Sequence, residues 1–143
     1  SLEAQARSAP AKVGDRILST IDAQIGQVYW SWSERVAGGV QLLTDPAISP
    51  VEEIKSPAGD ALADWVADDV FIAGDASEAV IRCHAAFAHS GSDSTARPRP
   101  SQCALHYIDN PAPGRLITAQ ALEPRYVQQN IGWKKLSEQG NVD

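Results

Sequence analysis

The stretch Ile21-Asp-Ala-Gln-Ile-Gly-Gln-Val-Tyr-Trp30 reads as two β-strands that meet at a glycine turn. The glycine tolerates positive φ and allows the tight loop of a hairpin. We expect the first strand over residues 16–23 and the returning strand over residues 27–34. In the returning strand Trp30 and Trp32 lie two residues apart, which places both on one face of the strand. This pattern predicts an antiparallel hairpin whose tryptophans belong to the hydrophobic core.

Further elements are expected on both sides of the hairpin. Apolar residues recur at helical spacing in several segments, and short apolar runs next to glycine or proline indicate strands. These signals predict helices over residues 2–13, 58–67, 78–89 and 101–108, a helix start at Ser49, a Ser77 N-cap, and strands over residues 40–43, 70–75 and 121–127. The polar segment 90–100 has too little apolar content to pack, so we expect a mobile loop there.

The order of these elements predicts an α/β fold. Three antiparallel strands are followed by a helix, a strand, a helix and a late strand. The apolar run 70–75 suits a buried parallel strand with helices on both sides. This order fits a ribonuclease-H-like lobe, the unit of the actin, heat-shock-chaperone and sugar-kinase superfamily, in which helices cover a mixed sheet. We therefore expect residues 1–143 to form a single domain.

Length and composition agree with one domain around one core. The chain has 143 residues, of which 43% are apolar, and folding at this size hides about 70% of the surface of the unfolded chain. The chain begins at Ser1 and contains no methionine, so we expect a fragment of a longer protein. It has neither a run of about 20 apolar residues nor a basic-then-apolar leader, so we expect a soluble, cytoplasmic protein.

The net charge of −6 is unevenly distributed. Nine acids and one lysine lie between Asp45 and Glu78, a charge of −8, and the rest of the chain sums to +2. Binding to phosphates needs clustered Lys and Arg, so the acidic middle disfavours a nucleic-acid-binding module that uses Trp30 and Trp32 as stacking platforms. The acidic segment is interpreted as a solvated face, with a docking patch as the alternative.

The residue types of metal and acid–base chemistry are present without the required spacing. His84 and His89 are five residues apart, about 140° on a helix, whereas two ligands on one helix face need a spacing of three or four. His106 stands alone. Asp22 and Asp75 follow predicted strands, but two-metal nucleases need more acids than these. An Asx turn that closes the hairpin is the favoured role of Asp22.

Nucleotide and thiol chemistry are equally unsupported. Gly74 is a lone glycine after a strand and belongs to no phosphate-binding motif, so an ordinary turn accounts for it better. Cys83 and Cys103 lack the spacing of a zinc site. We expect Cys83 to be a reduced thiol packed on the apolar stripe of its helix, with a disulfide as the alternative. No cofactor, metal ion or catalytic residue is predicted in this chain.

Two phrases carry a resemblance to a known family. The hairpin phrase of residues 21–30 and the phrase Glu123-Pro-Arg-Tyr-Val-Gln-Gln-Asn-Ile-Gly-Trp-Lys-Lys135 resemble the second lobe of the TsaB family, also called YeaZ. The match is clear over residues 1–34 and 121–136. The phrases stand in the expected order and at about the expected separation, and the Trp-Lys-Lys tail lies near the C-terminus as in that family.

The resemblance implies a scaffold subunit without catalytic activity. TsaB proteins act with the catalytic subunit TsaD and the small ATPase TsaE to install threonylcarbamoyl on the adenosine beside the anticodon of tRNAs that read codons beginning with A. The chain would be the C-terminal lobe of such a protein, with self-association expected through the absent N-terminal lobe. Arg125, Trp133, Lys134 and Lys135 are candidate partner contacts. The alternative is an actin-like kinase or a glycoprotease-type peptidase whose active site lies in the N-terminal lobe.

Overall fold

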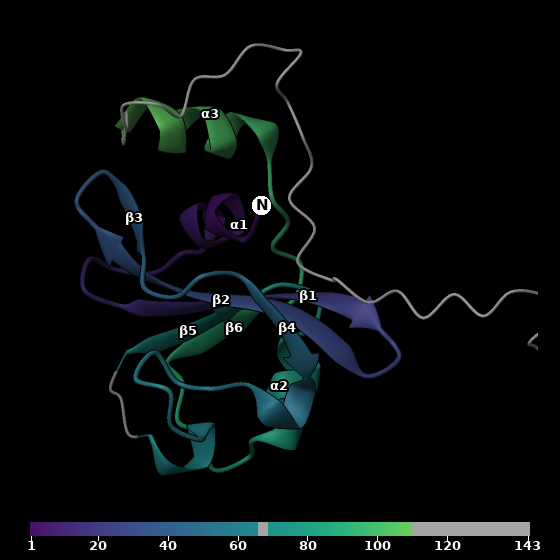
Figure 1. Ribbon diagram of the computed structural model, residues 1–143. Coiled ribbons are helices and arrows are strands. Elements are labelled where there is room, and N and C mark those ends of the chain that lie inside the picture. Colours follow the sequence, from purple (N-terminus) through teal and green to yellow (C-terminus); the bar gives the residue numbers. More distant parts are fainter. Residues whose placement is uncertain (66–68, 110–143) are drawn as a thin grey trace, which may run out of the picture.

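A six-stranded sheet forms the centre of the protein, and helices lie on both of its faces (Figure 1). The computed structural model describes residues 1–65 and 69–109. The strands are β1 (Arg16–Gln24), β2 (Gln27–Val36), β3 (Gly39–Leu42), β4 (Ala47–Pro50), β5 (Val70–Ala73) and β6 (Gly91–Asp93). The helices are α1 (Leu2–Ser8), α2 (Ser77–Cys83) and α3 (Pro100–Asp109), with the short 3-10 turns η1 (Val51–Glu53) and η2 (Leu62–Asp64).

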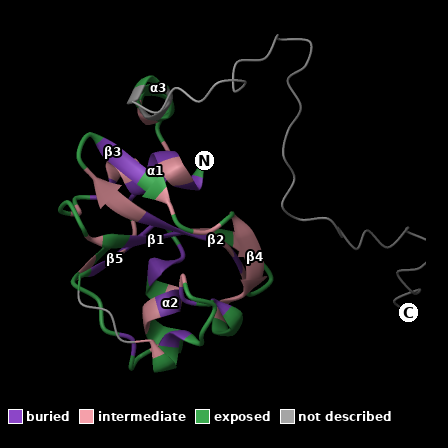
Figure 2. Ribbon diagram, turned by 60° about the vertical axis from the view of Figure 1, so that its left-hand side comes forward, coloured by how far each residue is buried: buried purple, intermediate pink, exposed green. Residues whose placement is uncertain are grey.

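The sheet is mixed, as the order of elements predicted. Its strand order is β3-β2-β1-β5-β6, and β4 pairs with β2. β1 runs antiparallel to β2 and parallel to β5, which in turn runs parallel to β6. α1 and α3 lie on one face of the sheet, whereas α2 and the two 3-10 turns lie on the other (Figure 1). β1 is the central strand, and Figure 2 shows its middle part buried.

The tryptophans of the returning strand are in the core, which confirms that prediction. Trp32 is fully buried and Trp30 is 7% exposed. Both indole N–H groups have partners, because Trp32 Nε1 donates to the Lys55 carbonyl at 2.8 Å and Trp30 Nε1 donates to Ser49 Oγ at 3.0 Å. The Trp32 ring also meets Trp65 edge-on, with 5.1 Å between ring centroids. Neither Trp30 nor Trp32 offers a free face for a nucleic-acid base.

Small side chains form the interface between α1 and the opposite face of the sheet. Ser19 and Ser31 are register partners in β1 and β2, and both are fully buried. Ala6 of α1 and Ala73 of β5 belong to the apolar cluster on this face. Side chains this short let the helix approach the sheet closely, at the cost of buried serine hydroxyls without partners.

α1 ends earlier than the sequence predicted. It was expected to reach residue 13, but it stops at Ser8, two residues before Pro10. The Arg35 guanidinium lies at its C-terminal end and donates to the carbonyls of Ala6, Arg7 and Ala9. The Ala6 carbonyl also accepts from the Ala9 N–H at 3.1 Å. The carbonyls at this end are the negative end of the helix dipole, so Arg35 caps α1 from the neighbouring sheet.

The two helices predicted in the acidic middle are each reduced to a short 3-10 turn, η1 at Val51–Glu53 and η2 at Leu62–Asp64. Ser49 belongs to β4, which pairs with β2, so Ser49 is not the first residue of a helix. Its hydroxyl accepts from Trp30 and donates to the Pro50 carbonyl, so it caps no helix. The helix expected over residues 58–67 is reduced to η2, and Gly59 before it has a φ of +94°. Pairing with β2 and a glycine turn override the local helical spacing here.

α2 is confirmed, but it ends at Cys83, and two of its details were wrong. Ser77 is the first helical residue, and Ala76 precedes it without a side-chain cap. Val80 and Phe87 are buried as expected, whereas Cys83 is exposed. Because the helix ends at Cys83, the apolar stripe expected to run from Val80 through Cys83 to Phe87 is interrupted there, and the Cys83 thiol stays exposed. Cys103 is also a free, exposed thiol.

The segment 90–100 is built into the structure and is not the loose loop that its composition suggested. Residues 91–93 form β6 on β5. Ala96 is buried, and its carbonyl accepts from Gln5 Nε2 at 3.1 Å. α3 follows close to the predicted bounds, while the strand expected over residues 121–127 lies outside the described residues. Within residues 1–65 and 69–109, no helix is long and apolar enough to cross a bilayer.

Candidate functional site

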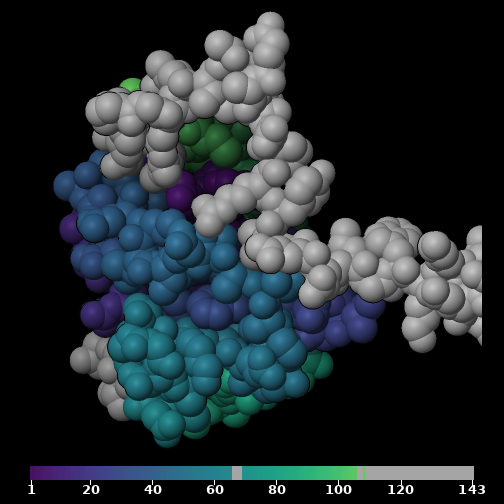
Figure 3. Space-filling view, in the orientation of Figure 1, coloured from purple at the N-terminus to yellow at the C-terminus, as the bar shows by residue number. Residues whose placement is uncertain are grey.

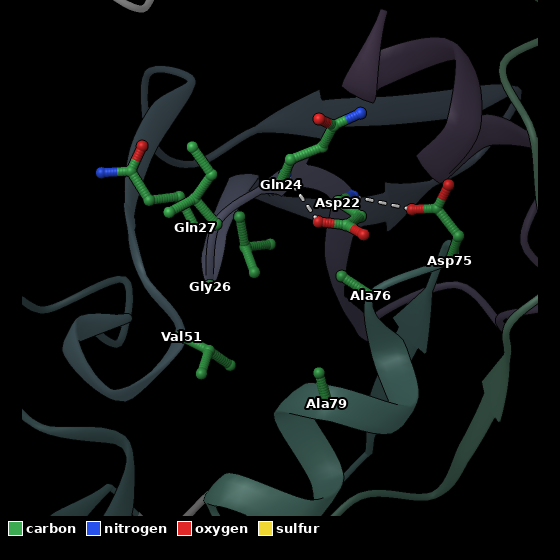
Figure 4. A pocket seen from close by; sticks show the side chains of 10 residues that line it. Asp22, Gln24, Gly26, Gln27, Val51, Asp75, Ala76 and Ala79 are labelled. Carbon is green, nitrogen blue, oxygen red and sulfur yellow. Dashed lines mark hydrogen bonds between the residues drawn. The ribbon is translucent and has the colours of Figure 1, made fainter. Parts of the chain in front are cut away.

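The carboxyl ends of β1 and β5 lie side by side, and in α/β sheets this is where ligands usually bind. A pocket of about 500 Å³ opens there between the β1–β2 hairpin and α2 (Figure 4). Asp22 and residues 24–28 of the hairpin line one side, and Val51, Asp75, Ala76 and Ala79 line the other. It is the best candidate site in the described part of the chain.

The two aspartates of this pocket bind backbone amides. Asp75 Oδ1 accepts a hydrogen bond from the Asp22 N–H at 2.8 Å, and Asp22 Oδ1 accepts from the Gln24 N–H at 2.7 Å (Figure 4). The second bond is the Asx turn predicted for Asp22. The first was missed, because it joins residues 53 positions apart. The carboxylates thus hold the base of the hairpin against the end of β5.

The described residues do not assemble a metal site. Among residues 1–65 and 69–109, no three His, Cys, Asp or Glu side chains come together as potential ligands. His84 Nε2 lies 2.8 Å from the Val51 carbonyl, which only accepts, so this nitrogen carries the proton and donates. His89 Nδ1 lies 3.4 Å from the Phe87 carbonyl. The side chain of His106 lies outside the described part of the structure.

Gly74 is more than an ordinary turn residue. Its φ is +118°, and a Cβ added there would lie 1.8 Å from the Thr20 carbonyl oxygen and 2.2 Å from Gln5 Nε2. Gln5 is fully buried on α1, and its Nε2 donates to the carbonyls of Thr20 and Ala96. The β1 backbone and the Gln5 side chain therefore fill the space beside Gly74.

The backbone of the hairpin tip differs from the conformation that its sequence predicts. Gln24, Ile25 and Gly26 all have positive φ, at 67°, 54° and 75°, and Ile25 is fully exposed. From the sequence, positive φ was expected at the glycine alone. The signal was present in the pair Ile-Gly, where a two-residue hairpin loop ordinarily has Asn-Gly or Asp-Gly.

A smaller polar pocket of about 270 Å³ lies beside the end of β6. Asp93 Oδ1 accepts from the Thr95 hydroxyl at 2.7 Å and from the Thr95 N–H at 2.9 Å. These hydrogen bonds stabilise the carboxylate and lower the pKa of Asp93. Arg97 donates to the Ser94 and Ala96 carbonyls and lies 3.9 Å from Asp75, so this loop and the larger pocket are neighbours.

The candidate partner contacts near the C-terminus stay predictions. Arg125, Trp133, Lys134 and Lys135 all lie outside the described residues. The structure instead brings together Gln5, Asp22, Gly74 and Asp75, which come from three separate parts of the chain.

Comparison with known proteins identifies the fold. No family model and no curated protein matches the sequence. YeaZ from Pseudomonas aeruginosa is similar, with a TM-score of 0.62 and 22% sequence identity over 87% of this chain and 54% of that chain. An uncharacterized protein with similarity to peptidase YeaZ from Pseudomonas aeruginosa gives a TM-score of 0.65 and 24% identity over 89% of this chain and 55% of that chain.

The chain spans about half the length of these YeaZ structures. The mixed α/β chain therefore has the fold of part of a YeaZ-type protein. This finding confirms the likeness to the TsaB/YeaZ family that the hairpin phrase and the C-terminal phrase predict.

Proposed function

We propose that this chain is the C-terminal lobe of a two-lobe protein of the TsaB/YeaZ type, with a ribonuclease-H-like fold. The likeness to about half of the YeaZ chains supports this proposal. The strand order also supports it, because three antiparallel strands are extended by parallel strands after helical connections, the order expected of such a lobe. Residues 1–143 would then be one domain, joined to an N-terminal lobe in the parent protein.

The proposed function is a cytoplasmic scaffold subunit in the synthesis of threonylcarbamoyladenosine in tRNA. The similarity to YeaZ is the observation that carries it. The lobe would act with a TsaD-type catalytic subunit and a TsaE-type ATPase, and would meet tRNA through the complex. Arg125, Trp133, Lys134 and Lys135 remain proposed contacts, and self-association is assigned to the N-terminal lobe.

The geometry at the ends of β1 and β5 supports a role without catalysis. Asp22 and Asp75 both accept backbone N–H groups, and Gln5 fills the space beside Gly74. Each carboxylate uses one acceptor position for a backbone N–H, and no third His, Cys, Asp or Glu side chain of the described residues joins the pair as a potential metal ligand. Here these groups fasten the hairpin to the sheet, which is a structural use of a position that enzymes use for chemistry.

The test is the threonylcarbamoyladenosine content of tRNA, measured by nucleoside mass spectrometry in cells depleted of the parent protein. We expect the modified nucleoside to fall by at least tenfold and to return with the intact gene. In a reconstituted reaction, the parent alone should give no product, and product should form only when the catalytic subunit is added.

Two results would count against this function. Unchanged tRNA modification after depletion would remove the protein from the pathway. Peptide hydrolysis or phosphoryl transfer by the purified parent alone would favour the alternative enzyme, an actin-like kinase or a glycoprotease-type peptidase with its active site in the N-terminal lobe.

A further inference from the structure

Ile25 combines two unfavourable properties at the tip of the β1–β2 hairpin. Its side chain is 100% exposed, and its φ of 54° lies in the left-handed region, which β-branched residues rarely adopt. The loop Ile25-Gly26 has positive φ at both positions, as in a type I′ turn, where Asn-Gly is favoured. Isoleucine gains no packing here in return for the strain, and a strained exposed residue of this kind points to binding.

The tip projects beyond the rest of the described chain, with a pocket behind it. The end of the hairpin stands out at the right of the molecule (Figure 1, Figure 3). The pocket of about 500 Å³ has an apolar lining from Val28, which is buried, and from Val51 and Ala79, which are half-buried. The exposed tip and the adjoining pocket, whose lining is partly apolar and partly polar, are together called the hairpin site.

The charged residues in and near the hairpin site are mostly acidic. Two acids, Asp22 and Asp75, line the pocket. Three exposed acids lie within two residues of a lining residue in the sequence: Glu52, Glu53 and Glu78. Within residues 1–65 and 69–109, Arg97 is the basic group that pairs with one of them, at 3.9 Å from Asp75. This field repels phosphates and attracts Lys and Arg. The occupant with complementary charge is therefore a basic protein segment, and not RNA.

We propose that the hairpin site docks a basic, partly apolar segment of the catalytic subunit, with Ile25 as the apolar anchor and the surrounding acids facing Lys or Arg of that segment. This inference rests on the proposed function. It adds a second contact, in this lobe, to the association expected of the N-terminal lobe. The Asx turn of Asp22 and the bond from the Asp22 N–H to Asp75 hold the tip in position before binding, which reduces the entropy lost on docking.

The proposal is tested by titrating the full-length parent protein with the purified catalytic subunit in a calorimeter. The variant Ile25→Asn should bind about 10- to 100-fold more weakly, because burying an isoleucine side chain contributes that much affinity. The same variant should melt at a higher temperature than the wild type, because Asn-Gly suits the turn. Weaker binding by a more stable protein excludes misfolding as the cause.

Matched variants separate the anchor from the charge. Ile25→Leu keeps an apolar side chain and should bind within about threefold of the wild type. The double variant E52K/E53K should bind more weakly, and its deficit should shrink as salt is raised. Val13→Asn removes a side chain that is 70% exposed elsewhere and should leave affinity unchanged.

Each result has one meaning. If the wild-type parent does not bind the catalytic subunit, both the proposed function and this inference fail. If the wild type binds and Ile25→Asn binds equally well, the hairpin site is not part of the interface, and the proposed function stands. Affinity that rises in E52K/E53K would overturn the assignment of a basic partner.

Discussion

Replacement of Gly74 by alanine should be among the most damaging single changes in this fold. A Cβ at this position would lie 1.8 Å from the Thr20 carbonyl oxygen, whereas carbon–oxygen contacts in sheets are about 3.3 Å or longer. The end of β5 would have to withdraw from β1 by about 1.5 Å. The Cβ would also lie 2.2 Å from Gln5 Nε2 and would displace the side chain that bonds the carbonyls of Thr20 and Ala96.

The expected loss has three parts. The two buried hydrogen bonds of Gln5 contribute about 1 kcal/mol each. Overpacking against the β1 backbone costs about 1–3 kcal/mol, and a positive φ costs a residue with a Cβ about 1–2 kcal/mol. We therefore expect Gly74→Ala to lower the free energy of unfolding by about 4 kcal/mol or more. A domain of this size has about 5–15 kcal/mol in total.

Urea denaturation followed by tryptophan fluorescence measures this loss, because Trp30 and Trp32 are buried in the native state. Gly59→Ala is the matched control. Gly59 has a φ of +94° but nothing within 4 Å of an added Cβ, so it should lose only the roughly 1–2 kcal/mol of backbone strain. If Gly74→Ala and Gly59→Ala lose the same free energy, the close approach of β1 and Gln5 to Gly74 is refuted.

Three further predictions concern polar contacts of the same fold. Arg35→Ala should lower the free energy of unfolding by about 2 kcal/mol, because the last carbonyls of α1 lose a charged donor, and a loss below about 0.5 kcal/mol in urea denaturation would contradict the cap. The pKa of Asp93 is lowered by hydrogen bonds from Thr95, so this carboxylate stabilises the fold above its unfolded pKa of about 3.9 and loses that contribution as the pH falls through its folded pKa. Thr95→Val should raise the pKa of Asp93 in a carbon-13 NMR titration, and an unchanged midpoint would refute the hydroxyl bond. Asp75→Ala should speed hydrogen exchange at the Asp22 amide, while Asp75→Asn, which keeps an acceptor, should not.

The sequence predicted the hairpin because its signal is local. Trp30 and Trp32 alternate with short polar residues, and the glycine between the strands permits the turn. The parallel strand β5 was predictable for a similar reason, since a short apolar run that ends at a glycine is typical of a buried strand. In both cases a stretch of about ten residues holds the information that decides its own structure.

The predictions that failed depend on partners that are distant in the sequence. β4 contains Ser-Pro, a helix-start signal, yet its pairing with β2 and the bond from the Trp30 indole to Ser49 fix it as a strand. β6 is Gly-Ser-Asp, without strand propensity, and is held by β5. The Gln5 amide reaches Ala96 across 91 residues. No pattern within a short window of sequence contains such contacts, so tertiary pairing overrides local propensity.

At the candidate site too, the local contacts were predictable and the contacts between distant residues were not. The Asx turn of Asp22 was predictable from its place at the end of a strand, but the bond from the Asp22 N–H to Asp75 was not. The positive φ of Ile25 was not predicted, because the neighbouring glycine alone is enough to explain a turn at this position. Its significance depends on its own backbone angle and exposure, which only the folded chain displays.

The carboxylates of Asp22 and Asp75 hold the projecting hairpin in place. The Asp75 carboxylate bonds the Asp22 N–H, and the Asp22 carboxylate bonds the Gln24 N–H, so the restraint passes from the end of β5 to the residue next to Ile25. A scaffold benefits from having these carboxylates bound, because a fixed tip loses less entropy on association than a loose one. One arrangement therefore accounts for two observations. Both carboxylates bond backbone N–H groups at the ends of β1 and β5, and the strained Ile25 beyond them is exposed and presented for binding.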